Sequence, residues 1–226
     1  MARILVIGTA TLDLIYTLER YPQEDTELRA LNFRLGRGGN ATNTLVVLSQ
    51  LGHECAFGGV LAEGPEAAPI LEDLARYRID LSFCRRVPGR PPISCILISL
   101  ERGTRTIAHY RDLPEYGYDE FCHVDLTPFD WIHFEGRHGG ETIRMLRRVR
   151  SLRPGLPCSV EVEKPSPGIE LVFAEADVLL FSQAYVRAVG VPTDGTWRGR
   201  YYRTKQVEAY AVREGPDWLV IWRERL

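Results

Sequence analysis

The stretch "LGRGGNATNT", Leu35 to Thr44, predicts more about this 226-residue chain than any other segment of similar length. It places three glycines within four residues, followed by two asparagines, Asn40 and Asn43. Glycine permits backbone conformations and close approaches that a side chain forbids. The following residues, "ATNTLVVLSQLG", predict a helix with Asn40 as its N-cap and Gly52 as its C-terminal stop. We therefore expect a helix N-terminus beside an unusually permissive backbone.

Three interpretations of this stretch are open on spacing alone. Gly36, Gly38 and Ala41 fit the dinucleotide pattern G-x-G-x-x-A, but the preceding "LRALNFRL" alternates, whereas a first Rossmann strand is buried on both faces. The asparagines, with Asp13 as a carboxylate acceptor, could instead bind the vicinal hydroxyls of a sugar. A glycine turn with an asparagine cap needs no ligand, and the spacing by itself slightly favours it.

The rest of the chain predicts an α/β fold. Arg3 to Gly8 is a continuous apolar run, typical of a strand buried on both faces. The early strands alternate between apolar and polar residues, which indicates a small sheet with one solvated face. Strands and helices then alternate, which predicts a mainly parallel sheet with flanking helices. The stretches concerned are "TLDLIYTL", "LRALNFRL", the hairpin "ISCILISL" and "TRTIAHY", and later "DWIHFEG", "GETIRMLRRVRSL", "CSVEVEK" and "DVLLFS".

Composition excludes several classes of function. With 45% hydrophobic and 26% charged residues and a net charge of -2, the chain resembles an ordinary globular protein, and we expect no nucleic-acid or membrane partner. The five cysteines are dispersed, which argues against a zinc site or disulfide framework and favours a cytoplasmic location. The five histidines show no ligand spacing and are interpreted as structural or solvent-exposed. After Gly190 the composition shifts, and there "QVEAYAVRE" is compatible with a helix and "DWLVIW" with a strand.

Seven stretches in the same order resemble the PfkB (ribokinase-like) carbohydrate kinase family, and within it the ketohexokinase branch. They extend from about Ile4 to about Gly190: "ILVIGTATLDLI", "RYPQEDTELRAL", "RGGNATNTLVVLSQLG", "GTRTIAHYRDLPE", "FDWIHFEGR", "SVEVEKP" and "DVLLFS". The resemblance implies a Rossmann-like ribokinase fold over residues 1–190, with a small β-sheet lid formed from about 12–36 and 93–111. Residues 191–226 are then a divergent tail or a truncated continuation, so that the C-terminal part is incomplete.

The resemblance also implies an activity and a binding site. The activity is ATP-dependent phosphorylation of fructose to fructose 1-phosphate, with ATP and Mg2+ as cofactors and a possible homodimer formed through the lid. By motif, the sugar-binding residues are Asp13, Gly39, Asn40 and Asn43.

By the same motifs, the resemblance implies a second set of residues that contact phosphate or nucleotide. Each of these residues also has a simpler explanation that needs no ligand. Arg105 could be an exposed hairpin arginine. Glu135 and Arg137 could form an ion pair or a helix cap. Lys164 could belong to a surface salt bridge with Glu163.

One family motif has no counterpart among the 226 residues. The late G-A-G-D turn opens a helix whose amides stabilise the transferring phosphoryl group, and its aspartate takes the proton of the sugar hydroxyl. The sequence contains no G-A-G-D, and Ser182-Gln183 does not reproduce the polar Asn-x-x-Glu group of many members. We therefore assign no catalytic residue and no metal ligand, and expect this chain to be inactive alone. The alternatives are a catalytically silent sugar-binding or dimerising module, or another PfkB sugar kinase.

Overall fold

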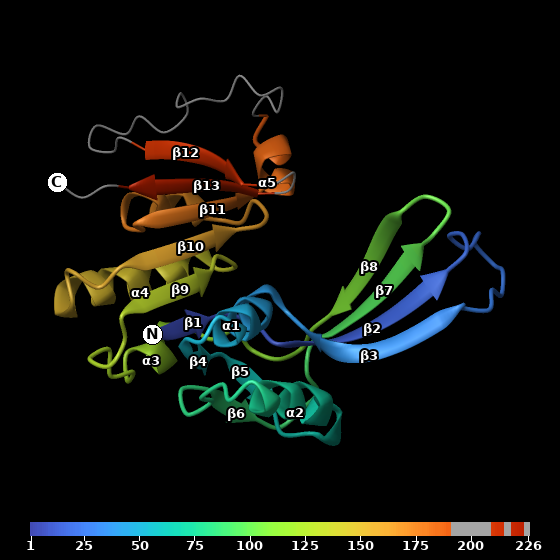
Figure 1. Ribbon diagram of the computed structural model, residues 1–226, viewed down its shortest axis with the longest axis horizontal. Coiled ribbons are helices and arrows are strands. Elements are labelled where there is room, and N and C mark those ends of the chain that lie inside the picture. Colours follow the sequence, from blue (N-terminus) through green and yellow to red (C-terminus); the bar gives the residue numbers. More distant parts are fainter. Residues whose placement is uncertain (191–208, 215–217, 224–226) are drawn as a thin grey trace.

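The computed structural model describes residues 1–190 in full and the backbone of residues 209–214 and 218–223. Its main layer is a seven-stranded sheet, from which a second, four-stranded sheet projects as a lid (Figure 1). The strands of the main sheet, in spatial order, are β12 (Ala209–Glu214), β13 (Trp218–Arg223), β11 (Val178–Ser182), β10 (Cys158–Val162), β9 (Trp131–Glu135), β1 (Arg3–Ile7) and β4 (Glu54–Gly58).

The pairing of these strands confirms the predicted α/β class. From β4 to β11 every neighbouring pair is parallel, and β13 and β12 add two antiparallel strands at one edge. The strand predicted from "DWLVIW" is confirmed as β13. The helix considered for 206–214 is wrong, because Ala209–Glu214 pairs with β13 along its whole length. Backbone pairing at the sheet edge outweighs the helix-compatible composition of this segment.

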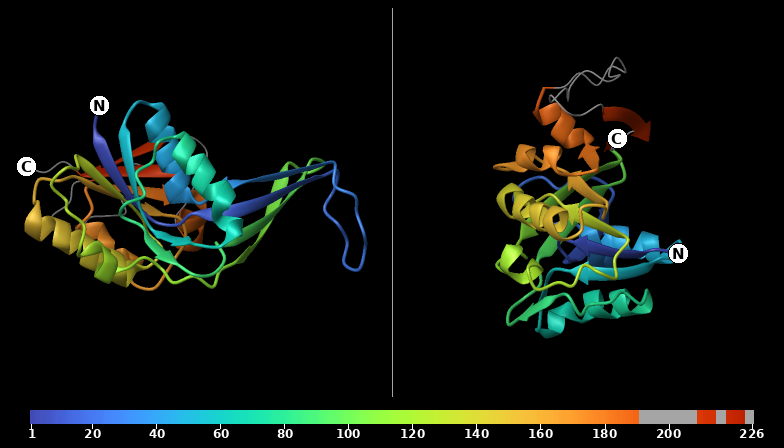
Figure 2. Two further views of the ribbon diagram at one scale, coloured as in Figure 1. Left: turned by 90° about the horizontal axis from the view of Figure 1, so that it is seen from below. Right: turned by 90° about the vertical axis from the view of Figure 1, so that its left-hand side faces the viewer.

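Helices cover the main sheet on both faces, as Figure 2 shows. The side chains of β1 explain this arrangement, because Leu5 and Ile7 belong to one buried cluster and Ile4 and Val6 to the other. One face carries α1 (Asn40–Gln50) and α2 (Ala68–Arg76), and the other carries α3 (Tyr118–Phe121), α4 (Gly139–Leu152), the 3-10 helix η2 (Ile169–Ala174) and α5 (Gln183–Ala188). A short 3-10 turn η1 (Pro65–Ala67) and the strand pair β5 (Val60–Ala62) and β6 (Arg85–Val87) complete the fold. Among the described residues, none of these helices has the length and apolar character needed to cross a membrane.

The lid is a mixed sheet that projects beyond the carboxyl ends of the main strands (Figure 1). It contains β3 (Asn32–Gly38), β2 (Thr11–Leu18), β7 (Ile93–Ser99) and β8 (Thr104–Tyr110), in that spatial order. The β2–β7 pair is parallel and the two outer pairs are antiparallel. This confirms the small sheet predicted from the alternating strands. One face packs toward the body through Leu12, which is buried, and the other face carries Asp13.

The glycine-rich stretch is neither a plain turn nor a helix cap made by asparagine. Gly36 and Gly38 lie in β3, and the residue that caps α1 is Gly39, with Asn40 already helical. A Cβ atom on Gly38 would overlap the carboxylate of Asp13, which lies against it across the β2–β3 pair. Gly39 has φ +99°, and a Cβ there would overlap the carbonyl oxygen of Thr9. The glycines therefore mark a place at the base of the lid where neighbouring groups lie too close to leave room for a Cβ atom.

We expect Gly39→Ala to lower the free energy of unfolding by about 1–3 kcal/mol, because alanine disfavours positive φ and its Cβ would overlap Thr9. The measurement is a urea unfolding midpoint with an unchanged slope. Gly36→Ala is the matched control, since a Cβ at that position meets no heavy atom within 4 Å and φ is not positive. Equal midpoints for the two variants would contradict the role given to Gly39.

Candidate functional site

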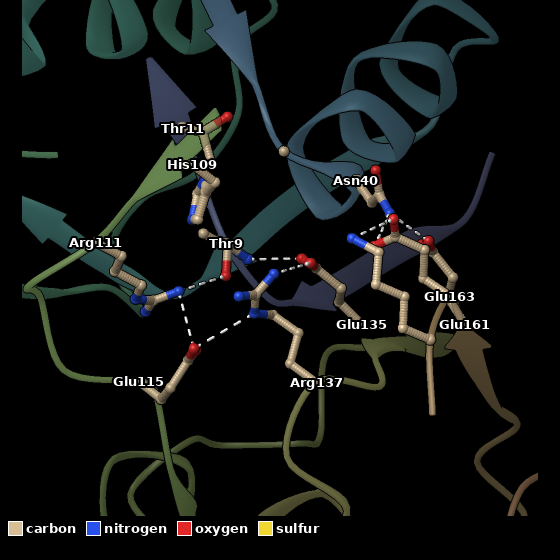
Figure 3. Close-up of polar contacts among 12 residues, drawn as sticks. Thr9, Thr11, Asn40, His109, Arg111, Glu115, Glu135, Arg137, Glu161 and Glu163 are labelled. Atoms are coloured by element: carbon tan, nitrogen blue, oxygen red, sulfur yellow. Dashed lines mark hydrogen bonds and ion pairs between the residues drawn. The ribbon is translucent and has the colours of Figure 1, made fainter. Parts of the chain in front are cut away.

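The base of the lid meets the carboxyl ends of β1 and β9 around a buried carboxylate, Glu135 (Figure 3). Glu135 ends β9, and its Oε2 accepts the backbone N–H of Thr9 at 2.9 Å, just where the chain leaves β1 for the lid. Its Oε1 accepts from the Arg137 guanidinium at 3.3 Å. Open parallel sheets bind ligands at this edge, because the loops that follow the strands leave a crevice there.

A chain of alternating charges extends from Glu135 back to the lid (Figure 3). Arg137 lies 3.4 Å from Oε1 of Glu115, and the same oxygen lies 3.0 Å from Arg111. Arg111 follows β8 directly and donates to Oγ1 of Thr9 at 3.1 Å. It also donates to the carbonyls of Leu113 and Pro114, so its whole guanidinium is engaged. The last strand of the lid is thereby tied to the segment that leads into the first.

Burial governs the ionisation of Glu135. Desolvation raises its pKa above the ordinary value, and Arg137 and the Thr9 N–H offset this only in part, while Glu161 adds to it. The guanidinium of Arg137 is about one-third exposed, so solvent weakens its pairing with Glu135. This edge of the sheet thus holds a carboxyl whose proton is bound more tightly than that of a surface glutamate.

The four expected sugar-binding residues lie at or near the joint between lid and body. Asp13 is partly buried, and its Oδ1 accepts a hydrogen bond from Thr11 at 2.8 Å. Asn40 donates to Glu161, the last but one residue of β10, and to Glu163, which follows this strand. Asn43 accepts from Arg37 at 2.7 Å.

The two asparagines also border a cavity of about 620 Å³ between α1 and strands β9 to β11. The cavity has a mainly apolar lining, and its polar members are Asn40, Asn43, Thr44, His133, Ser159 and Glu161. The side chains of Asn40 and Asn43 are therefore accessible from this cavity, although each also makes a hydrogen bond within the protein.

The expected phosphate or nucleotide contacts are only partly brought together. Glu135 and Arg137 form the ion pair that was weighed as their alternative, at the centre of the cluster in Figure 3. Lys164 pairs with Glu163 at 3.2 Å and is largely exposed, just beyond β10. Arg105 lies opposite Ile98 in the β7–β8 strand register, beside the hairpin turn at the outer end of the lid (Figure 1). Its side chain is exposed. The described residues contain no group of three or more His, Cys, Asp or Glu that could hold a metal ion.

Sequence reasoning missed Thr9, Arg111 and Glu115. All three lie in connections between elements, and no periodicity marks Thr9 or Glu115. A signal was present for Arg111, because the alternation of β8 places it on the same strand face as His109. Leu113, Pro114 and Glu115 lie in the same loop as Arg111, whereas Thr9 lies 102 residues away in sequence, so only the fold shows that this loop meets Thr9.

Arg111→Ala should lower the free energy of unfolding by about 1–3 kcal/mol and speed hydrogen exchange in β7 and β8, since it removes the donor to two carbonyls and leaves Glu115 with Arg137 alone. Denaturant unfolding and hydrogen exchange measure the two effects. Arg105→Ala is the control on the same strand, and because Arg105 is exposed it should change the unfolding free energy by less than about 0.5 kcal/mol. Indistinguishable variants would show that the cluster does not hold the lid.

The raised pKa of Glu135 predicts a dependence of stability on pH. In the window above the ordinary value of 4.5 and below the raised value, the folded state binds a proton that the unfolded state has lost. Stability contributed by Glu135 is therefore complete below pH 4.5 and is lost as pH rises through the folded pKa. We expect the stability difference between wild type and Glu135→Gln to fall across this window, as measured by urea unfolding at several pH values. A difference that grows with pH would mean that Arg137 outweighs burial.

Comparisons with known proteins place the sequence in a family. Residues 1–137 match the model of the pfkB family carbohydrate kinases. The chain is 38% identical to ketohexokinase from Mus musculus over 230 aligned residues, covering 96% of this chain and 77% of that enzyme.

Two solved structures share the fold. A protein assigned as a ribokinase from Agrobacterium tumefaciens aligns with TM-score 0.71 and 22% identity, over 85% of this chain and 63% of that one. Arabidopsis thaliana ribokinase, solved with ribose and ATP, aligns with TM-score 0.59 and 14% identity, over 80% and 71% of the two chains. The match to the family model and the identity to the mouse enzyme, on a ribokinase fold, show that the chain belongs to the pfkB family of carbohydrate kinases.

Proposed function

We propose that this chain binds a ketohexose at the base of the lid and that it is related to enzymes whose reaction is the ATP-dependent phosphorylation of fructose to fructose 1-phosphate. The observation that carries the proposal is the 38% identity to a ketohexokinase over nearly the whole chain. It is supported by the position of Asp13, whose carboxylate lies against Gly38, two residues before Asn40. Other sugars of the family remain alternatives that the binding experiment below separates.

Hydroxyl recognition is supported by the atoms that the internal contacts leave free. Among residues 1–190, Asp13 Oδ2, Asn40 Oδ1 and Asn43 Nδ2 make no hydrogen bond, while the other polar atom of each side chain is engaged. Each side chain is thus held in place through one polar atom, and its other polar atom can bind a ligand. Two acceptors and one donor suit the vicinal hydroxyls of a sugar, which donate and accept together.

Phosphate binding is supported by the cations at the same edge. Arg111, Arg137 and Lys164 follow β8, β9 and β10, and the positive charges of all three act on His109 of the lid. Guanidinium and ammonium groups suit phosphate oxygens. ATP, when bound, would supply the phosphoryl group. Arg137 and Lys164 would position it, and Arg111, whose guanidinium is held by protein groups, would only add positive charge. The described residues present no metal-binding cluster, so our proposal takes no step through a metal held by the protein.

The proposal includes a limit on turnover by this chain. Its 226 residues contain no G-A-G-D segment, and Glu135, the buried carboxyl of the cluster, is occupied by Thr9 and Arg137. Within this cluster Glu135 is thus not available to take the proton of a bound hydroxyl, and we assign Asp13 to binding. We therefore propose sugar binding without rapid phosphoryl transfer.

We expect Asp13→Ala to weaken fructose binding by at least about tenfold, because a charged acceptor of hydroxyl hydrogen bonds is lost. Isothermal titration calorimetry with fructose measures this, and ribose and glucose serve as competing sugars. Asp112→Ala is the control, since Asp112 is an exposed aspartate near the lid. Full affinity in the Asp13 variant would remove the sugar site from this position, and tighter binding of ribose would change the sugar.

With Mg-ATP and saturating fructose, the purified chain should form fructose 1-phosphate no faster than a blank without protein. A coupled ADP assay, with direct detection of the sugar phosphate, measures the rate. Turnover above about 1 s⁻¹, in the range of ordinary kinases, would refute the limit and show that the described residues suffice for catalysis.

A further inference from the structure

A polar row crosses the lid on the face that carries Asp13. Asp13 of β2 pairs with Ser94 of β7, and Ser94 pairs with His109 of β8. Directly paired residues on neighbouring strands point to the same face of a sheet. A carboxylate, a hydroxyl and an imidazole therefore lie side by side across three strands, at the end of the lid nearest the body.

The contacts of His109 hold one ring nitrogen and leave the other. Its Nδ1 lies 3.1 Å from the hydroxyl of Ser94, which is buried. Within residues 1–190 the other nitrogen, Nε2, makes no hydrogen bond, and the residue is exposed. The bond to Ser94 selects the tautomer, so that a donating serine makes Nε2 a donor and an accepting serine makes it an acceptor. The ring is thus oriented and has one free position.

The surroundings of His109 keep the imidazole neutral. Its pKa is lowered, first by partial desolvation at the base of the lid and then by Arg137, Arg111 and Lys164, while Asp13 acts in the opposite direction. These are the charged groups that face it from the lid and from the body. A neutral ring at neutral pH suits an uncharged hydroxyl, whereas the three cations around it suit a phosphate.

We propose that His109 is a further sugar-binding residue, with Nε2 hydrogen-bonded to a hydroxyl of the ketose held by Asp13, and that Ser94 is the positioning residue for its ring. The inference rests on the proposed function, and it gives the lid a direct part in recognising the substrate. The lid then contributes two side chains from strands far apart in sequence, and both reach the sugar from the same face.

Calorimetric titration of the full chain with fructose and with its monodeoxy analogues tests the assignment. Wild type is compared with His109→Ala, His109→Gln, Ser94→Ala and Asp13→Ala. Tyr110→Ala is the matched control, because Tyr110 neighbours His109 but points to the opposite face of β8. The deoxy analogues report on the partner of His109, which a change in lid stability would not reveal.

We expect His109→Ala to weaken fructose binding about tenfold, as the loss of one hydrogen bond would. His109→Gln should retain most of the affinity, Ser94→Ala should lose about threefold, and Tyr110→Ala should bind as wild type does. One monodeoxy analogue should bind equally to wild type and His109→Ala, which identifies the hydroxyl contacted by Nε2.

Two other results would each refute the assignment of His109, and they differ in what they mean for the proposed sugar site. If Asp13→Ala loses fructose while His109→Ala keeps wild-type affinity for every analogue, the role of His109 is refuted and the proposed sugar site stands. If wild type binds no ketose, or Asp13→Ala binds as wild type does, the proposed function itself fails and this inference fails with it.

Discussion

The structure depends on the close packing of other segments against Thr9, which lies between β1, the first strand of the body, and β2, the first strand of the lid. The Thr9 amide donates to the buried Glu135, its carbonyl lies against Gly39, and its hydroxyl accepts from Arg111. Three connections between lid and body therefore meet at one residue. A side chain at position 39 would overlap the Thr9 carbonyl, and a shorter side chain at 135 would leave the Thr9 amide without its acceptor.

Placing a carboxylate at this junction has an energetic cost that its partners must offset. Burial of an ionised group is favourable only when hydrogen bonds and opposite charges replace its hydration. Glu135 obtains an amide hydrogen and a guanidinium, and the guanidinium is shared with the more exposed Glu115. Arg137 and Arg111 both contact Glu115, so these side chains hold one another in position. The cluster matters more for this fixed geometry than for the free energy of unfolding. That is the property a binding site needs from its supporting groups.

The joint brings two kinds of surface together. The lid presents a row of polar side chains, with Asp13 at one end and His109 at the other. The body presents arginine and lysine after consecutive strands of the sheet. Uncharged hydroxyls and charged phosphates require these different partners, and in a sugar kinase both must be held within reach of each other. The relatives of the chain act on sugars, which is consistent with this separation.

The sequence by itself determined the α/β class, the lid strands, the helix after the glycines and the family, because each of these is written in local periodicity or in contiguous motifs. The sugar site that the sequence predicts at Asp13, Gly39, Asn40 and Asn43 stays a prediction. The sequence placed the helix cap one residue too late, and it misassigned Ala209–Glu214, because a hydrogen-bonding neighbour cannot be seen from one strand alone. Only the tertiary structure decided that Arg111 and Glu115 join Glu135, that Glu135 is buried, and that His109 faces the same space as Asp13. Each of these depends on contacts between residues distant in sequence, whose burial and charge environment exist only once the strands have paired.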